Sequence, residues 1–184
     1  AMQWLEDKVF YRDKKKVIQM RLDHIAYRVA DRNTAAELLK AMFDYKIETE
    51  FDIVFDDGSK ADCIAMTPKE KMYNVPSIEA GGHRHVAPEI FISDGDENSI
   101  VGSWVAERSG VGGVHHFAYQ VFGIDRVVKD WREKGVEFLT EKIIDCPEDE
   151  LRQIFTKPLP QLGGAIIELI ERGHKGFCQN SVKN

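Results

Sequence analysis

The sequence has no excess of positive charge, few cysteines and no long apolar run. Its 184 residues carry 25 basic and 31 acidic side chains, a formal charge of -6, which opposes attraction to phosphate backbones or anionic lipid. The three cysteines lack Cys-x-x-Cys spacing, so we expect reduced thiols and no cysteine zinc site. No apolar run approaches the ~20 residues that span a bilayer. We therefore expect a cytoplasmic protein that binds neither nucleic acid nor membranes.

The chain does contain an internal repeat. Residues 22–29 read LDHIAYRV and residues 114–121 read VHHFAYQV, with His, Ala, Tyr and Val in register. Both octamers mix β-branched and aromatic residues over the length of a strand, and a helix signal follows each. A repeat of this kind predicts two modules with the same fold.

A helix is expected after each repeated strand. Asp31 or Asn33 would cap the first helix, and Asp125 would cap the second, which would end at Gly135. The apolar faces expected from the helical period are Leu38, Leu39, Met42 and Phe43 in the first helix and Val127, Val128 and Trp131 in the second.

Three further strands are expected in each module, at residues 47–55, 60–67 and 88–92 in the first copy and 136–144, 151–157 and 165–170 in the second. Tyr73 to Val86 is extra in the first copy, as a loop or a short added hairpin, and residues 99–108 form a connecting helix.

We therefore predict an α+β fold in which two tandem βαβββ modules form a paired, half-barrel-like mixed sheet. The expected boundaries are an N-terminal extension (1–20), a first module (21–95), a linker helix and turn (96–112), a second module (113–173) and a C-terminal tail (174–184).

Three residues at matching positions indicate a metal site. His24 and His116 each take the third place of their repeated strand, and Glu168 lies in an apolar strand where an unpaired carboxylate is costly to bury. A pseudo-twofold axis between the modules would bring them together as the two-histidine, one-carboxylate triad typical of non-haem Fe(II). Glu89, which we expect to be the counterpart of Glu168, would add a fourth ligand and favour Zn, Ni, Co or Mn as a Lewis acid. We expect His115 on the opposite face of its strand, in a structural role.

The repeated strands, the strand AIIELIER at residues 165–172 and the βαβββ unit resemble the vicinal oxygen chelate superfamily of glyoxalases, bleomycin resistance proteins and dioxygenases. Residues 151–159 (LRQIFTKPL) and 167–173 (IELIERG) are similar to the catalytic C-terminal half of 4-hydroxyphenylpyruvate dioxygenase. This resemblance implies the vicinal oxygen chelate fold and metal ligands at His24, His116 and Glu168. It also implies that Gln153 lies on the substrate side and that Phe155 forms a pocket wall.

The resemblance implies an Fe(II) dioxygenase acting on a small, aromatic 2-oxo acid. A second interpretation stays open, because the region around Glu89 and Trp104 is similar to methylmalonyl-CoA epimerase and glyoxalase I. These are metal-dependent isomerases or lyases that need no further cofactor. A third is a binding protein that sequesters a small drug in the cleft between the modules without turnover. Under each interpretation the partner is a small molecule, and a homodimer is compatible with all three.

Overall fold

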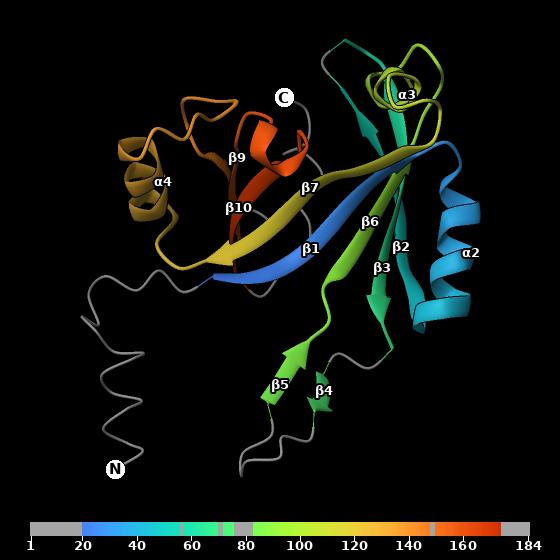
Figure 1. Cartoon of the computed structure of the whole chain (residues 1–184), viewed down its shortest axis with the longest axis horizontal. Coiled ribbons are helices and arrows are strands. Elements are labelled where there is room, and N and C mark those ends of the chain that lie inside the picture. Colours follow the sequence, from blue (N-terminus) through green and yellow to red (C-terminus); the bar gives the residue numbers. More distant parts are fainter. Residues whose placement is uncertain (1–19, 56, 70–71, 76–82, 148–149, 174–184) are drawn as a thin grey trace.

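The computed structural model describes residues 20–55, 57–69, 72–75, 83–147 and 150–173, and one curled sheet dominates them (Figure 1). Its eight strands run in the order β2-β3-β6-β1-β7-β10-β9-β8. The strand bounds are β1 (Met20–Val29), β2 (Tyr45–Val54), β3 (Lys60–Pro68), β6 (Glu89–Asp94), β7 (Gly112–Val121), β8 (Ile144–Cys146), β9 (Leu151–Phe155) and β10 (Ile166–Arg172). The expected extension and tail lie outside the described residues, apart from Met20.

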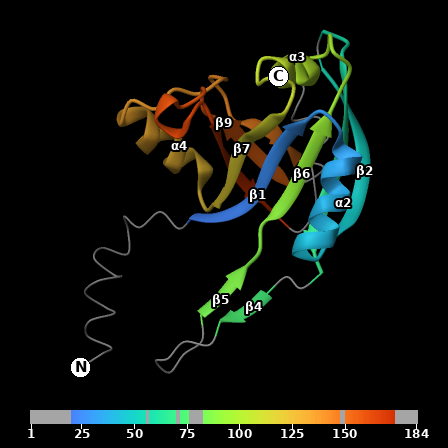
Figure 2. The ribbon, with the colours of Figure 1, turned by 45° about the vertical axis from the view of Figure 1, so that its right-hand side comes forward.

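The sheet is built from two similar halves that meet at its centre. β1 pairs with β6 in parallel, β7 pairs with β10 in parallel, and β1 and β7 join the halves as an antiparallel pair. Figure 2, turned from the first view, shows these central strands curving between the two halves. This arrangement confirms the predicted α+β fold and its half-barrel sheet.

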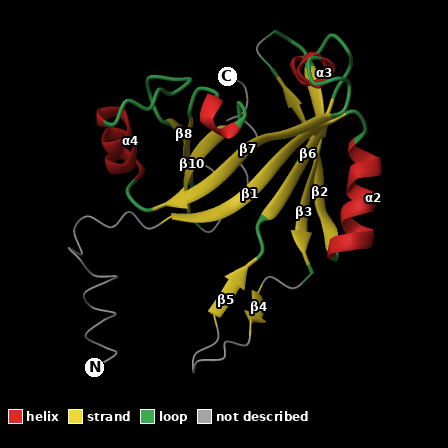
Figure 3. Cartoon of the chain, in the orientation of Figure 1, coloured by secondary structure: helices red, strands yellow, loops and turns green. Residues whose placement is uncertain are grey.

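Helices lie at both ends of the sheet, with α2 (Arg32–Phe43) on the outer side of the first half and α4 (Ile124–Glu133) beside the second (Figure 3). α3 (Ile100–Ala106) connects the halves as predicted. Two apolar clusters fill the space between helices and sheet, one around Ile64 and Met66 and the other around Ile154 and Leu169. None of the helices in the described part of the chain is long and apolar enough to cross a membrane.

The predicted helix caps and faces are only partly correct. Asp31 caps α2, because its Oδ1 accepts from the Thr34 backbone N–H at 2.9 Å. Of the predicted apolar face of that helix, Leu39 packs against the core, whereas Leu38, Met42 and Phe43 are exposed and Ala36 is buried instead. In the second module, Val127 and Val128 are buried as expected. Gly123 stands at the N-cap of α4 in place of Asp125, whose carboxylate instead accepts from Arg152.

The outer strands also differ in part from the prediction. Residues 136–139 form no strand, and only Phe138 makes an isolated bridge, to Thr156. The extra segment does contain a hairpin, β4 (Met72–Val75) with β5 (His83–Val86), as a separate two-stranded sheet. Cys63 is a free, buried thiol as expected, whereas Cys146 is disulfide-bonded, which corrects the expectation of three reduced thiols.

Candidate metal centre

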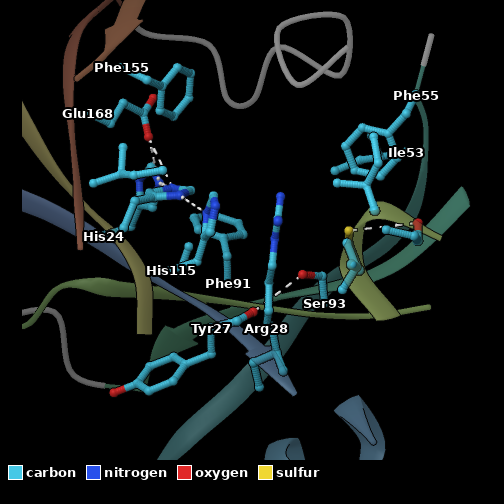
Figure 4. A pocket seen from close by; sticks show the side chains of 18 of the residues that line it. His24, Tyr27, Arg28, Ile53, Phe55, Phe91, Ser93, His115, Phe155 and Glu168 are labelled. Atoms are coloured by element: carbon cyan, nitrogen blue, oxygen red, sulfur yellow. Dashed lines mark hydrogen bonds and ion pairs between the residues drawn. The ribbon is translucent and has the colours of Figure 1, made fainter. Parts of the chain in front are cut away.

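His24, His116 and Glu168 converge from β1, β7 and β10 on one point of the sheet. Figure 4 shows His24 and Glu168 pointing toward one another. The Nε2 atoms of the two histidines are 3.2 Å apart, and Glu168 Oε2 lies 3.1 Å from His24 Nε2 and 3.3 Å from His116 Nε2. Three donors that share an ion at about 2.1 Å lie roughly 3.0–3.4 Å from one another. The donor types and their spacing therefore fit a divalent metal ion.

Burying the ionised carboxylate of this cluster costs free energy unless a positive charge lies beside it. Glu168 is 2% exposed, and burial alone would raise its pKa, but His24 and His116 outweigh it and lower the pKa to about 2. Burial lowers the pKa of His24, yet the carboxylates of Glu168 and Asp23 hold that pKa above its usual value. Burial dominates at His116 and lowers its pKa. The carboxylate is thus held in its ionised form, in which it can bind a cation.

Each histidine is oriented by the residue immediately before it. His24 Nδ1 contacts Asp23 Oδ2 at 3.0 Å, and His116 Nδ1 contacts His115 Nδ1 at 2.9 Å. Asp23 is fixed in turn by Arg172, whose guanidinium donates to it at 2.5 Å. With both Nδ1 atoms engaged, both Nε2 atoms face the shared point, an arrangement typical of metal-binding histidines.

Two β-bulges create these orienting contacts. Between Leu22 and His24 the register shifts by one, so Asp23 is the extra residue of β1; the second shift, between Ala26 and Tyr27, makes His115 the extra residue of β7. A bulge redirects side chains that strict alternation would send to the other face. The prediction that His115 faces away is therefore wrong, because His115 contacts His116 and lines the cavity.

Phe91, not Glu89, takes the position in the first module that Glu168 takes in the second. Glu168 pairs with Ala118, and in the other half Phe91 pairs with Ala26, whereas Glu89 pairs with His24. The Phe91 ring meets the His24 ring edge-on, with centroids 4.5 Å apart. Glu89 therefore lies outside the cluster. The predicted equivalence of Glu89 and Glu168 is wrong, because the residue equivalent to Glu168 is Phe91, two positions further along β6.

The cluster opens onto a cavity of about 480 Å³. Gln153 and Phe155 both line it; Gln153 is buried, its Nε2 has no hydrogen-bond partner among the described residues, and Phe155 lies edge-on to His116 at 5.5 Å. Lining residues that the sequence reasoning missed are Arg28, Phe51, Ile53, Phe55 and Phe91. The alternation along β1 could have indicated one of them, because Arg28 lies four residues after His24.

Comparison with solved structures shows similar folds among methylmalonyl-CoA epimerases. A selenomethionine-containing epimerase is 23% identical, with 83% of this chain and 95% of that chain covered and a TM-score of 0.59. A variant of the Streptomyces coelicolor epimerase, in complex with 2-nitronate-propionyl-CoA, is 21% identical over 84% and 98% of the chains, with a TM-score of 0.58. The Mycobacterium tuberculosis epimerase is 23% identical over 83% and 88%, with a TM-score of 0.56. At these identities the likeness concerns the fold alone.

The sequence comparisons establish the family. No curated protein gives a significant match. A family profile matches residues 23–149, which include the first two residues of the cluster and more than half of the chain. The chain therefore belongs to the Glyoxalase/Bleomycin resistance protein/Dioxygenase superfamily.

Proposed function

We propose that this protein is an enzyme that holds a divalent metal ion with His24, His116 and Glu168 and binds a small substrate through two neighbouring oxygen atoms. The observation that carries the proposal is the buried donor triangle at the wall of an apolar cavity. A bound divalent ion would supply Lewis acidity, polarising a carbonyl group of the substrate. The chain's own part is to fix the ligands, exclude water and enclose the body of the substrate.

For the reaction type, the first candidate is an isomerase or lyase of the methylmalonyl-CoA epimerase kind. Similar structures support this choice, since methylmalonyl-CoA epimerases are among them and one of these is in complex with 2-nitronate-propionyl-CoA. Such chemistry removes a proton next to a carbonyl group and therefore needs a base. Glu168 carries the carboxylate at the donor triangle, and it would serve as that base by taking the proton on an oxygen that does not hold the ion.

A second candidate, an Fe(II) dioxygenase for an aromatic 2-oxo acid, is favoured by a different observation. Phe91 occupies the position from which the first module would supply a fourth ligand, so the described cluster is the three-residue set that suits non-haem iron. Gln153 and Phe155 also line the cavity, as the resemblance to 4-hydroxyphenylpyruvate dioxygenase implies.

Two assays on separately loaded protein distinguish the candidates. Protein loaded with Zn, Co, Ni or Mn is incubated with methylmalonyl-CoA in deuterated water, and exchange at the 2-position is followed by NMR. Protein loaded anaerobically with Fe(II) is then mixed with 4-hydroxyphenylpyruvate in an oxygen electrode. Metal-dependent exchange without oxygen uptake supports the isomerase, and substrate-dependent oxygen uptake supports the dioxygenase.

The matched control compares two glutamates. Glu168→Ala should abolish whichever activity is found, because it removes a donor, whereas Glu89→Ala should retain it because Glu89 lies outside the cluster. Ligand binding without any turnover of either substrate, in protein that carries its metal, would contradict an enzymatic role for these substrate classes. Equal activity of Glu168→Ala and the wild type would overturn the proposed site itself.

A further inference from the structure

The cavity has a second polar end, formed by Arg28. Side chains alternate along β1, so His24, Ala26 and Arg28 share the cavity side, and all three line the cavity. Four residues of strand place the Cα atoms of His24 and Arg28 roughly 13 Å apart. In the view of Figure 4, the Arg28 guanidinium stands between Phe91 and His115 on one side and Ile53 and Phe55 on the other. The cavity thus has the histidine cluster at one end and, further along β1, a cationic group.

No acidic partner compensates Arg28 within the described residues. The contact that its guanidinium makes is with the Trp104 ring, at 5.8 Å from the centroid, and Arg108 stacks on the same ring at 3.6 Å. Burial, reinforced by the nearby Arg108, lowers the pKa of Arg28 to about 10, which leaves the group charged at neutral pH. A half-buried cation without a counter-charge is unfavourable. An anion that binds beside the guanidinium would supply the counter-charge that the described residues do not provide.

Two described residues that line the cavity carry carboxylates, Asp57 and Glu168, and neither forms an ion pair with Arg28. The carboxylate of Asp57 accepts a hydrogen bond from the backbone N–H of Ser59 at 2.9 Å. Glu168 lies at the other end, engaged with His24 and His116. Phe91 lies on the cluster side of Arg28, and Ile53 and Phe55 line the cavity on its far side (Figure 4), so the walls around the guanidinium suit an apolar body.

We propose that Arg28 is a substrate-binding residue that takes an oxyanion of an elongated substrate, whose opposite end lies at the histidine cluster. The planar guanidinium offers paired N–H donors that match a carboxylate or a phosphate. The substrate class is then a small molecule with an apolar middle, chelating oxygens at one end and a second anionic group at the other. The role of the cluster in this inference rests on the proposed function, whereas the anion site at Arg28 does not.

The test uses chelator-treated, metal-free protein and a pair of matched probes. 3-Phenylpropionate and its neutral amide have the same shape, so calorimetric titration of each measures the preference for the charge. The wild type should bind the carboxylate about tenfold more tightly than the amide. Arg28→Met should abolish this preference, and Arg28→Lys should retain part of it. Because the metal is absent, a failure of the proposed enzymatic function leaves this result unaffected.

The control variant is Arg108→Met, which removes a neighbouring positive charge that does not line the cavity. It should keep the preference for the carboxylate. Thermal unfolding provides a second readout: Arg28→Met should not lower the Tm, since the cation has no internal counter-charge to lose. A wild type that binds both probes equally or binds neither, or a preference that survives Arg28→Met, would overturn the proposal.

Discussion

The contact between His115 and His116 can be removed without altering any of the three proposed metal ligands. In His115→Leu, the Nδ1 of His116 loses its partner at 2.9 Å in a largely buried position. An unpaired buried donor costs about 1–3 kcal/mol. Outer partners of metal-binding histidines typically contribute 10–100-fold in metal affinity, about 1.4–2.7 kcal/mol. We therefore expect His115→Leu to bind zinc roughly 10–100-fold more weakly than the wild type.

The affinities are measured by competition against a chromophoric chelator at neutral pH. His115→Gln should recover most of the affinity, because its amide oxygen can accept from His116. Trp104→Phe is the control, since Trp104 meets the other side of His115 edge-on at 5.5 Å and touches no ligand directly. Equal zinc affinity of His115→Leu and the wild type would refute the orienting role of His115.

Three further predictions concern stability and reactivity. Gly112→Ala should lower the unfolding free energy in urea by more than about 2 kcal/mol, because φ is +80° there and the added Cβ would lie 2.0 Å from the Arg28 carbonyl oxygen. Gly110→Ala should cost less, because its Cβ would meet no atom within 4 Å. Cys63, whose pKa burial raises to about 12, should resist alkylation at pH 8 until the protein is unfolded. The low pKa of Glu168 stabilises the metal-free fold above about pH 4.5, and this contribution should fade as the pH falls toward about 2. In urea titrations, the unfolding free energy of Glu168→Gln should fall less steeply than that of the wild type as the pH drops from about 4.5 toward about 2.

The repeat was sufficient to predict which three residues of the candidate metal site meet. His24 and His116 recur at the same place of two octamers, and β1 and β7 pair directly at the centre of the sheet. The prediction that they converge with Glu168 required only the alternation of side chains and a symmetric pairing of the modules. Both of these follow from the period of the sequence.

Register and bulges could not be predicted in the same way. The two-residue difference between Glu89 and Phe91 depends on where β6 starts to pair with β1, which the apolar run alone does not specify. The orientation of His115 depends on one extra residue in β7, a feature set by the opposing strand. Similarly, the 3.6-residue period predicted one face for α2 from its larger apolar residues, but of these only Leu39 packs against the core, beside Ala35 and Ala36.

The central claim is that His24, His116 and Glu168 together hold one divalent metal ion. The most direct test is elemental analysis of anaerobically purified protein after loading and gel filtration, in the wild type, Glu168→Ala and Glu89→Ala, with circular dichroism to confirm folding. We expect one ion per chain in the wild type and in Glu89→Ala, and close to none in Glu168→Ala. A folded Glu168→Ala that keeps its full metal content, or a wild type that cannot be loaded, would contradict the account.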